Sequence, residues 1–200
     1  HSDLRRQRQM CIRDRQTPTL NADGGLVLRP ISSGDLPDLL ESYKESPEDG
    51  QTALPWMYPR NVAEQLADFV RDILRSAEED RIHFWSIRMD DQHVGTIGLG
   101  DELQLDLSNW SLGYWIRVGH QGQRIASRAI DAVFEWLNDR GIEAVVEVAV
   151  HPHNGPGLAT ARALCTRWGG TPLDDFVGID FGGRTIPHHL HLIQVGGGEA

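Results

Sequence analysis

The sequence predicts a mixed α/β domain, in which a mostly antiparallel mixed sheet is flanked by helices. Three observations point to this class. The composition, with 40% hydrophobic and 24% charged residues in a chain of 200, is typical of a single globular core. Three strand-like runs follow one another within residues 82–118, which is typical of antiparallel neighbours. After residue 122 helices and strands alternate, which is typical of crossover connections.

The individual elements follow from periodicity and from capping signals. Helices are expected where apolar residues recur every three or four positions, and strands where apolar and polar residues alternate. Gly141 and Gly169 mark two helix ends, because glycine readily adopts the conformation of a C-terminal cap. The expected strands are 26–30, 82–89, 93–102, 109–118, 143–150, 176–181 and 188–195. The expected helices are 33–46, 61–74, 122–140 and 158–168, and residues 47–59 are expected to form a loop.

The two ends of the chain differ from the rest. Residues 1–22 are expected to be a disordered or non-native tail, because the Arg/Gln-rich stretch 5–15 has neither a helical nor an alternating apolar period. A basic tail that touches a partner is the alternative. Residues 23–195 are expected to form the single folded domain, and the glycine-rich residues 196–200 a flexible end.

The formal charge of −10 is unevenly distributed. The first twenty residues carry five Arg and two Asp, which leaves −13 for residues 21–200. A segment with this much negative charge repels phosphate backbones, so nucleic acid is not expected as a partner. No apolar run approaches the ~20 residues of a membrane span, so no membrane association is expected. Two distant cysteines do not suggest a disulfide scaffold, so we expect a cytoplasmic protein in which Cys165 is a buried structural thiol.

The most informative stretch is the junction between the strand 109–118 and the helix that follows. A short polar turn containing Gly119 and Gly122 joins them, so the first N–H groups of the helix lack backbone partners and lie at the positive end of its dipole. A pyrophosphate is a natural ligand of that arrangement, although many such turns are purely structural. The turn lacks both the Gly-x-Gly-x-x-Gly pattern of dinucleotide-binding folds and the Gly-Lys-Ser/Thr ending of a P-loop.

Four landmarks, taken in order, resemble one enzyme family. Gln121-Gly122-Gln123-Arg124-Ile125-Ala126 is similar to the Gln/Arg-x-x-Gly-x-Gly/Ala motif of the GNAT superfamily of acetyl-CoA-dependent N-acetyltransferases. Three further landmarks resemble its ribosomal-protein-acetyltransferase-like subgroup, namely Leu112-Gly113-Tyr114-Trp115-Ile116, Leu26-Val27-Leu28-Arg29-Pro30 and His151-Pro152-His153-Asn154. The resemblance covers residues 25–195.

The resemblance implies a splayed sheet with acetyl-CoA as cosubstrate, bound in a V-shaped slot between the strands 110–118 and 143–150. Main-chain groups of Ile116, Arg117 and Val118 would pair with the pantetheine arm as an added strand would. Asn154 would contact that arm near the thioester. The turn residues that would hold the pyrophosphate are Gln121, Gly122, Gln123, Arg124, Ile125, Ala126 and Ser127.

The sequence departs from the family pattern at three places. Arg124 stands where the motif has glycine; its N–H group remains, and its guanidinium is able to pair with phosphate. Ser111 stands where an acidic residue is common. Residues 155–157, Gly-Pro-Gly, are expected to be an insertion before a helix that begins at Leu158.

The implied reaction is direct attack of an amine on the acetyl carbonyl, with a main-chain N–H near Ile116 stabilising the oxyanion. Because an ammonium must first lose a proton, a base is needed, and Glu102 and the adjacent Asp101 are the expected bases. Ser111 or Tyr114 would relay a proton or protonate the departing thiolate. The alternatives are a solvated strand end for the two carboxylates and a core position for Tyr114, which alternates with apolar residues.

Nine histidines raise the question of a metal site. His151 and His153 lie two residues apart at the end of one expected strand, and His189 and His191 lie two residues apart on the last one. Neither pair has a cysteine companion or a His-Glu-x-x-His spacing, so no metal is expected. His151 and His153 would lie beside the slot, where they are able to tune a proton route near neutral pH. Trp56, in the expected loop 47–59, is the tryptophan expected to contact the acceptor.

The expected function is therefore transfer of an acetyl group to a primary amine of a small molecule or a protein N-terminus. A catalytically silent CoA-binding module and a protein-interaction module of the same fold are the alternatives, motivated by Arg124 and Ser111. The acceptor stays open, because the loops that would select it vary within such a family. Exposed closing strands are typical of a dimer interface, so a homodimer is a further expectation.

Overall fold

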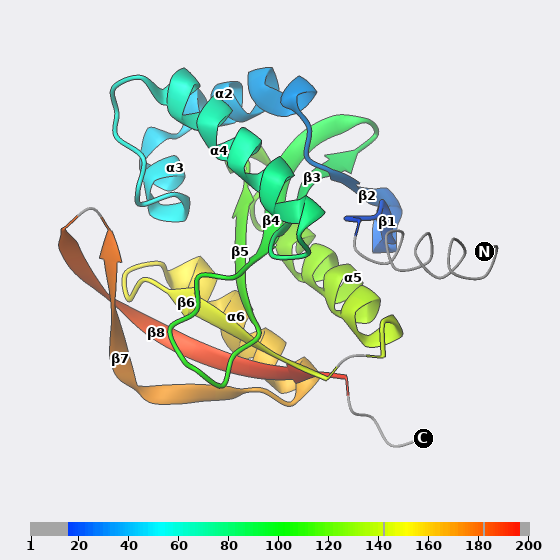
Figure 1. The fold of residues 1–200 in the computed structure, drawn as a ribbon, viewed down its shortest axis with the longest axis vertical. Helices are drawn as coiled ribbons and strands as arrows, with labels where there is room; N and C mark the ends of the chain where they lie inside the picture. The colour runs from blue at the N-terminus through cyan, green and yellow to red at the C-terminus, as the bar shows by residue number, and fades with distance from the viewer. Residues whose placement is uncertain (1–15, 142, 182, 197–200) are drawn as a thin grey trace, which may run out of the picture.

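The computed structural model describes residues 16–141, 143–181 and 183–196, which form an eight-stranded sheet with helices on both faces (Figure 1). The strands are β1 (Leu20–Ala22), β2 (Leu26–Pro30), β3 (His83–Met89), β4 (Gln92–Gly100), β5 (Trp110–Ile116), β6 (Ala144–Val150), β7 (Thr171–Phe181) and β8 (Arg184–Val195). Their spatial order is β1-β2-β3-β4-β5-β6-β8-β7, and each neighbouring pair is antiparallel except β5 with β6. The predicted fold class is confirmed.

Two groups of helices cover the two faces of the sheet. The helices are α2 (Leu36–Glu45), α3 (Pro47–Ala53), α4 (Val62–Glu78), α5 (Ile125–Asp139) and α6 (Gly155–Trp168), with 3-10 turns at Asp23–Gly25, Ser33–Asp35 and Val118–His120. α5 and α6 pack on the main core, where Trp85 and Phe134 are fully buried. α2 and α4 pack on the other face, in a second cluster that includes Leu66 and Trp115. Figure 1 shows α2 and α4 together across the top of the molecule.

The folded domain begins earlier than residue 23, which corrects the predicted boundary of the tail. β1 pairs with β2, and the carbonyl of Pro18 accepts a hydrogen bond from the Trp85 indole at 2.7 Å. A strand of three residues is too short to show an alternating pattern, so β1 could not be predicted from periodicity. Residues 1–15 and 197–200 lie outside the described residues, and the predictions for them stay predictions.

Residues 47–59 contain a helix where a loop was predicted. Pro47 stands in the first turn of α3, where its missing N–H costs nothing, and Gly50 leaves room for the Tyr43 ring. Trp56 follows α3 and packs against Phe69 with ring centroids 5.0 Å apart. The structure therefore gives Trp56 a packing role in the second cluster instead of the predicted contact with the acceptor.

β7 and β8 form a longer hairpin than the sequence indicated. The predicted segments 176–181 and 188–195 lie inside the strands Thr171–Phe181 and Arg184–Val195. A register shift between Pro172 and Phe176 keeps the acidic stretch between them within the strand. This irregularity interrupts the alternation of apolar and polar residues from which the strand would have been predicted. In Figure 1 this hairpin (orange and red) extends to the left of the other strands. β7 is the edge of the sheet, and the homodimer stays a prediction.

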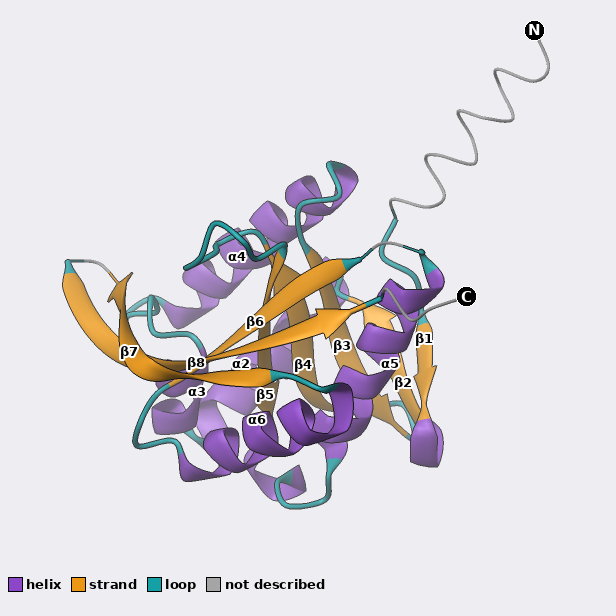
Figure 2. Ribbon diagram, turned by 90° about the horizontal axis from the view of Figure 1, so that it is seen from below, coloured by secondary structure: helices purple, strands orange, loops and turns teal. Residues whose placement is uncertain are grey.

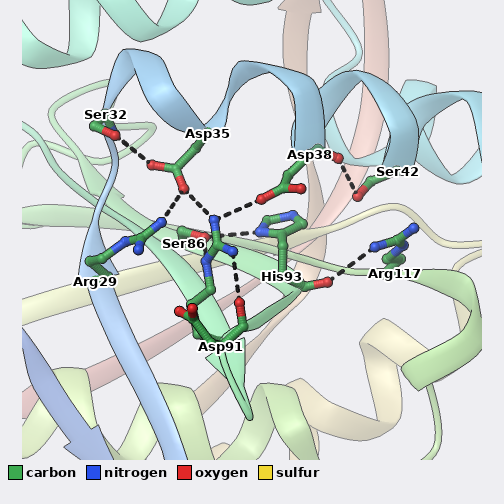
Figure 3. Close-up of polar contacts among 10 residues, drawn as sticks. Arg29, Ser32, Asp35, Asp38, Ser42, Ser86, Asp91, His93 and Arg117 are labelled. Carbon is green, nitrogen blue, oxygen red and sulfur yellow. Dashed lines mark hydrogen bonds and ion pairs between the residues drawn. The ribbon is translucent and has the colours of Figure 1, made fainter.

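A buried carboxylate joins the start of α2 to two strands (Figure 3). Asp35 is fully buried and accepts hydrogen bonds from Arg29 at 2.9 Å, from Arg88 at 2.6 Å and from the Ser32 N–H at 2.8 Å. Arg88 also pairs with Asp38 at 2.7 Å. Burial raises the pKa of Asp35, but the two guanidinium groups and Ser32 outweigh burial, so its pKa lies below the ordinary value. The carboxylate is ionised and holds α2 against β2 and β3.

Asp35→Asn is expected to lower the free energy of unfolding at pH 7 by roughly 3 kcal/mol, because two guanidinium groups lose their buried counter-charge. Urea denaturation measures this change. Asp68→Asn is the matched control: it removes an exposed pair with Arg71 and should cost less than ~1 kcal/mol. Equal stability of the two variants would contradict the importance of the Asp35 network.

His93 is expected to make stability depend on pH. Its ring is buried, Nδ1 lies 2.9 Å from the Ser86 hydroxyl, and burial lowers its pKa from 6.5 to about 4. Between these values the unfolded chain binds more protons than the folded one, so the stability present above pH 6.5 is lost as the pH falls toward 4. His93→Gln should therefore lose roughly 2 kcal/mol less than the unsubstituted protein between pH 7 and pH 5. Urea titrations of both proteins at the two pH values test this, and equal losses would refute it.

Candidate active site

β5 and β6 separate after a short parallel contact, and a cleft opens between them. Trp110 pairs with Val146 and Ser111 with Glu147, after which no further pair joins the two strands in the described part of the chain. β5 stays in the sheet because it pairs with β4 along its length. A cleft of about 730 Å³ lies in the opening. The sheet therefore has the splayed geometry that was expected.

The cleft passes through the sheet from one face to the other. Successive side chains of a strand point to opposite faces, and Ile116 belongs to the main core under α5 whereas Trp115 belongs to the second cluster under α2 and α4. Ser127 of α5 and Thr160 of α6 line one side of the cleft, and Thr52 of α3 lines the other. Figure 2 shows α6 and α4 on opposite sides of the sheet. Two substrates can thus meet in the opening from opposite faces.

The free edge of β5 presents main-chain groups to the cleft. Arg117 donates its N–H to the carbonyl of Val94 at 3.0 Å, so the alternate residues Tyr114 and Ile116 direct their main-chain groups away from β4 and toward the opening. This corrects the set expected from the sequence. The N–H of Arg117 is not free, and Val118 lies past the end of the strand in a 3-10 turn. Tyr114 and Ile116 are the residues placed to pair with an extended ligand.

The turn before α5 leaves six consecutive N–H groups without acceptors. Gly122 and Arg124 have φ angles of 74° and 59°, so the helix begins at Ile125 and not at residue 122 as predicted. Within the described ranges, the main-chain N–H groups from Gly122 to Ser127 have no hydrogen-bond acceptor. They lie at the N-terminus of a 15-residue helix, whose dipole favours anions. This set of donors fits a diphosphate.

Asn154 begins α6 beside the cleft. Its Oδ1 accepts a hydrogen bond from the N–H of Gly157 at 2.9 Å, and the helix starts at Gly155. The Gly-Pro-Gly segment is therefore the first turn of α6, with Pro156 where its missing N–H costs nothing, and the predicted insertion is wrong. Because Oδ1 serves as the cap, the Asn154 amide NH₂ is the group available to a ligand in the cleft that this residue lines.

The stretch that carries this geometry matches a known family. The family model described as an acetyltransferase (GNAT) domain matches residues 25–164. The chain belongs to the GNAT acetyltransferase family. Its activity is therefore acetyl transfer from acetyl-CoA to an amine, as expected from the sequence. Among curated proteins, none matches the chain significantly.

Solved structures of GNAT acetyltransferases share the fold at low sequence identity. RimL, a ribosomal L7/L12 alpha-N-protein acetyltransferase in complex with coenzyme A, has a TM-score of 0.73 at 18% identity, over 88% of this chain and 97% of its own. RimJ of Mycobacterium smegmatis, in complex with a CoA disulfide, has a TM-score of 0.65 at 19% identity, over 88% and 86%. The ribosomal-protein-S5-alanine acetyltransferase of Vibrio fischeri has a TM-score of 0.69 at 14% identity, over 89% and 97%.

Gln121 of the GNAT motif connects the anion-binding turn to α3. Its Nε2 donates to the carbonyl of Ile116 and to Asp49 Oδ2, both at 3.1 Å. Arg117 makes a second connection, to Glu45 of α2 at 2.7 and 2.5 Å, and this pairing raises the pKa of Arg117. α3 and α2 are thus attached to the segment between β5 and α5. The sequence missed Asp49 and the rest of α3, because Pro47 and Gly50 read as loop residues.

Tyr114 is the predicted catalytic residue that the structure places in the cleft. It lines the cleft with Thr160 of α6, whose side chain faces its hydroxyl, and that hydroxyl is sealed from solvent. Burial raises the pKa of Tyr114, against a smaller opposing effect of Thr160. The phenol is therefore protonated at neutral pH and has a proton to give.

The other predicted catalytic residues do not line the cleft. Glu102 is exposed in the loop after β4, and Asp101 pairs with Arg81 at 3.0 Å. Ser111 lies at the closed end of the opening, between Gly100 and Glu147. A role as base for Glu102 stays a prediction, but the structure gives it no contact with the cleft.

Glu147 is a buried carboxylate that the sequence analysis missed. It accepts hydrogen bonds from the N–H groups of Gln104 at 2.7 Å and Leu105 at 3.3 Å. These contacts hold the loop after β4 over the closed end of the opening. A carboxylate in the middle of the apolar run Ala144–Val150 was the available signal.

Two further findings concern metals and membranes. In residues 16–141, 143–181 and 183–196, no three His, Cys, Asp or Glu side chains lie close enough together to hold a metal ion. Over the same ranges, no helix has the length and apolar character needed to cross a membrane.

Arg124→Gly is expected to stabilise the protein by about 1 kcal/mol relative to Arg124→Ala, because glycine adopts the positive φ of this position without strain. Both variants remove the guanidinium, so the comparison isolates the backbone. Urea denaturation measures the difference. Equal stability of the two variants would show that the turn carries no conformational strain.

Proposed function

We propose that this GNAT enzyme acetylates the N-terminal amine of a peptide or protein. The run of six free N–H groups at residues 122–127, at the mouth of a cleft that crosses the sheet, is the observation that carries the proposal. It supports a diphosphate-bearing cosubstrate on the α5 and α6 face and an acceptor that enters from the α2–α4 face.

Acetyl-CoA would be held by three sets of groups. The N–H groups from Gly122 to Ser127 would bind the pyrophosphate, with the Arg124 guanidinium as an additional charge. Main-chain groups of Tyr114 and Ile116 would pair with the pantetheine amides, as an added strand does. The Asn154 amide would donate to a carbonyl of the arm.

The chemistry follows from the meeting of the two substrates in the opening. A neutral amine attacks the thioester carbonyl, the oxyanion is stabilised by the Ile116 N–H, and the C–S bond breaks as the amide forms. Tyr114 donates its proton to the departing thiolate, since the buried phenol is protonated at neutral pH. The amine nitrogen gives up its remaining excess proton as the intermediate collapses, and this proton restores the Tyr114 phenol.

A peptide N-terminus suits the acceptor side better than a buried small-molecule site does. The cleft opens beside α3, where Asp49 offers a negative charge to an incoming ammonium. The net charge of −10 also favours cationic acceptors over anionic ones. RimL and the ribosomal-protein-S5-alanine acetyltransferase, which share the fold, act on ribosomal proteins. Such an acceptor would place the enzyme in the cytoplasm.

Thiol release from acetyl-CoA across a panel of amines tests the proposal. Short peptides that begin with Ser or Ala should be acetylated with a kcat/KM at least about tenfold above that of spermidine. The same peptides with a blocked N-terminus and an internal Lys are the control and should be inert. Preference for spermidine would refute a peptide acceptor, and silence toward all amines with intact CoA binding would identify a silent binding module.

A further inference from the structure

Three imidazole rings gather at one end of the cleft. His151 and His153 follow the end of β6, and His188 lies near the start of β8. The ring centroids of His151 and His153 are 5.3 Å apart, and those of His151 and His188 are 5.7 Å apart. All three residues line the cleft. The fold thus brings two histidines that follow β6 and one histidine of β8 to the same cleft.

His188 lies on the acceptor side of the sheet. β6 and β8 are antiparallel, with Val150 opposite His189, so the next pair places His151 and His188 together on the other face. Val150 belongs to the main core under α5 and α6. The face opposite Val150 is the α2–α4 face, from which the acceptor would enter.

The hydrogen bonds select one ring nitrogen as a free base. The carbonyl of Ile186 lies 3.0 Å from His188 Nδ1 and can only accept, so this nitrogen carries the proton of the neutral ring. Nε2 then keeps its lone pair, and within the described ranges it has no hydrogen-bond partner. His151 differs, because its Nδ1 accepts the N–H of His153 at 3.2 Å, which puts the proton of neutral His151 on Nε2. Neutral His151 therefore has no lone pair left for a substrate.

The surroundings keep His188 neutral at physiological pH. Burial lowers its pKa, the Ile186 carbonyl opposes that shift, and charge on His151 lowers the pKa further. Across β7 the facing side chains are Val177, its strand partner, and Phe181, whose ring centroid is 5.9 Å away, and both are uncharged. The acid facing the same cleft is Asp49 on α3, which is engaged by Gln121.

We propose that His188 is the general base of the reaction, its Nε2 removing a proton from the acceptor ammonium. The inference rests on the proposed function and names the residue that makes the amine nucleophilic. The N–H bond of the ammonium breaks, the proton passes to Nε2 to give an imidazolium, and the electron pair stays on nitrogen for attack on the thioester. The imidazolium returns its proton to water through the open mouth of the cleft.

The experiment measures acetylation of a Ser-initial peptide by the full chain and by His188→Ala. The variant should lose about 10²-fold in kcat/KM while its Kd for CoA, which binds on the other face, stays the same. His189→Ala is the matched control, because its ring packs on Phe176 on the opposite face of β8, with centroids 4.3 Å apart. The control should keep kcat/KM within about twofold. If His188→Ala does not fold, His188→Gln replaces it.

The pH profile and imidazole rescue separate a base from a structural residue. In the unsubstituted protein kcat/KM should rise with pH and become constant above the pKa of His188, which lies below the ordinary value of 6.5. In His188→Ala, kcat/KM should keep rising about tenfold per pH unit until the peptide amine itself is deprotonated. Added imidazole should restore thiol release to His188→Ala and leave the rate of His189→Ala unchanged. A His188 variant with unchanged rate, or one with lower rate but an unchanged profile and no rescue, would overturn the assignment and leave the proposed function standing. Silence of the unsubstituted protein toward the peptide would instead reject the proposed function.

Discussion

The parting of β5 from β6 is the constraint on which the site depends. Backbone groups in a sheet interior need partners, and a strand that loses its neighbour halfway along exposes donors and acceptors that something must satisfy. Here the pairing with β6 ends after Ser111, so the main-chain groups of Tyr114 and Ile116 face the opening instead of hydrogen-bonding to a neighbouring strand. An extended amide-bearing ligand is the natural replacement for the missing strand. The same opening lets a second substrate reach the ligand from the other face.

Contacts from the rest of the fold fix the positions of the segments that border this opening. β5 contributes Ile116 to the core under α5 and Trp115 to the cluster under α2 and α4, so the helices on both faces of the sheet pack against the same strand. At the closed end, Glu147 fastens the loop after β4. On the α2–α4 face, Gln121 and Arg117 attach the segment between β5 and α5 to α3 and α2. These contacts come from segments far apart in sequence and converge on one short stretch of chain.

Sequence reasoning succeeded where one segment determines its own structure. The periodic apolar face of α5 and the glycine turn before it could be recognised in the sequence, and with them the family. It failed where the outcome depends on distant partners. β1 is evident only from its pairing with β2, and the buried Glu147 was missed because its burial depends on the whole fold. The position of His188 at the cleft follows from the register between β6 and β8, which the sequence alone does not show.

The left-handed residue at the start of α5 shows what the glycine of the family motif is for. Arg124 adopts this turn at a φ of 59°, so the backbone angle of the position is compatible with a side chain. Asn and Asp, which tolerate this angle better than other side chains, meet the same requirement. β-branched residues do not. In this chain the position therefore combines a left-handed backbone with a guanidinium placed next to the proposed diphosphate site.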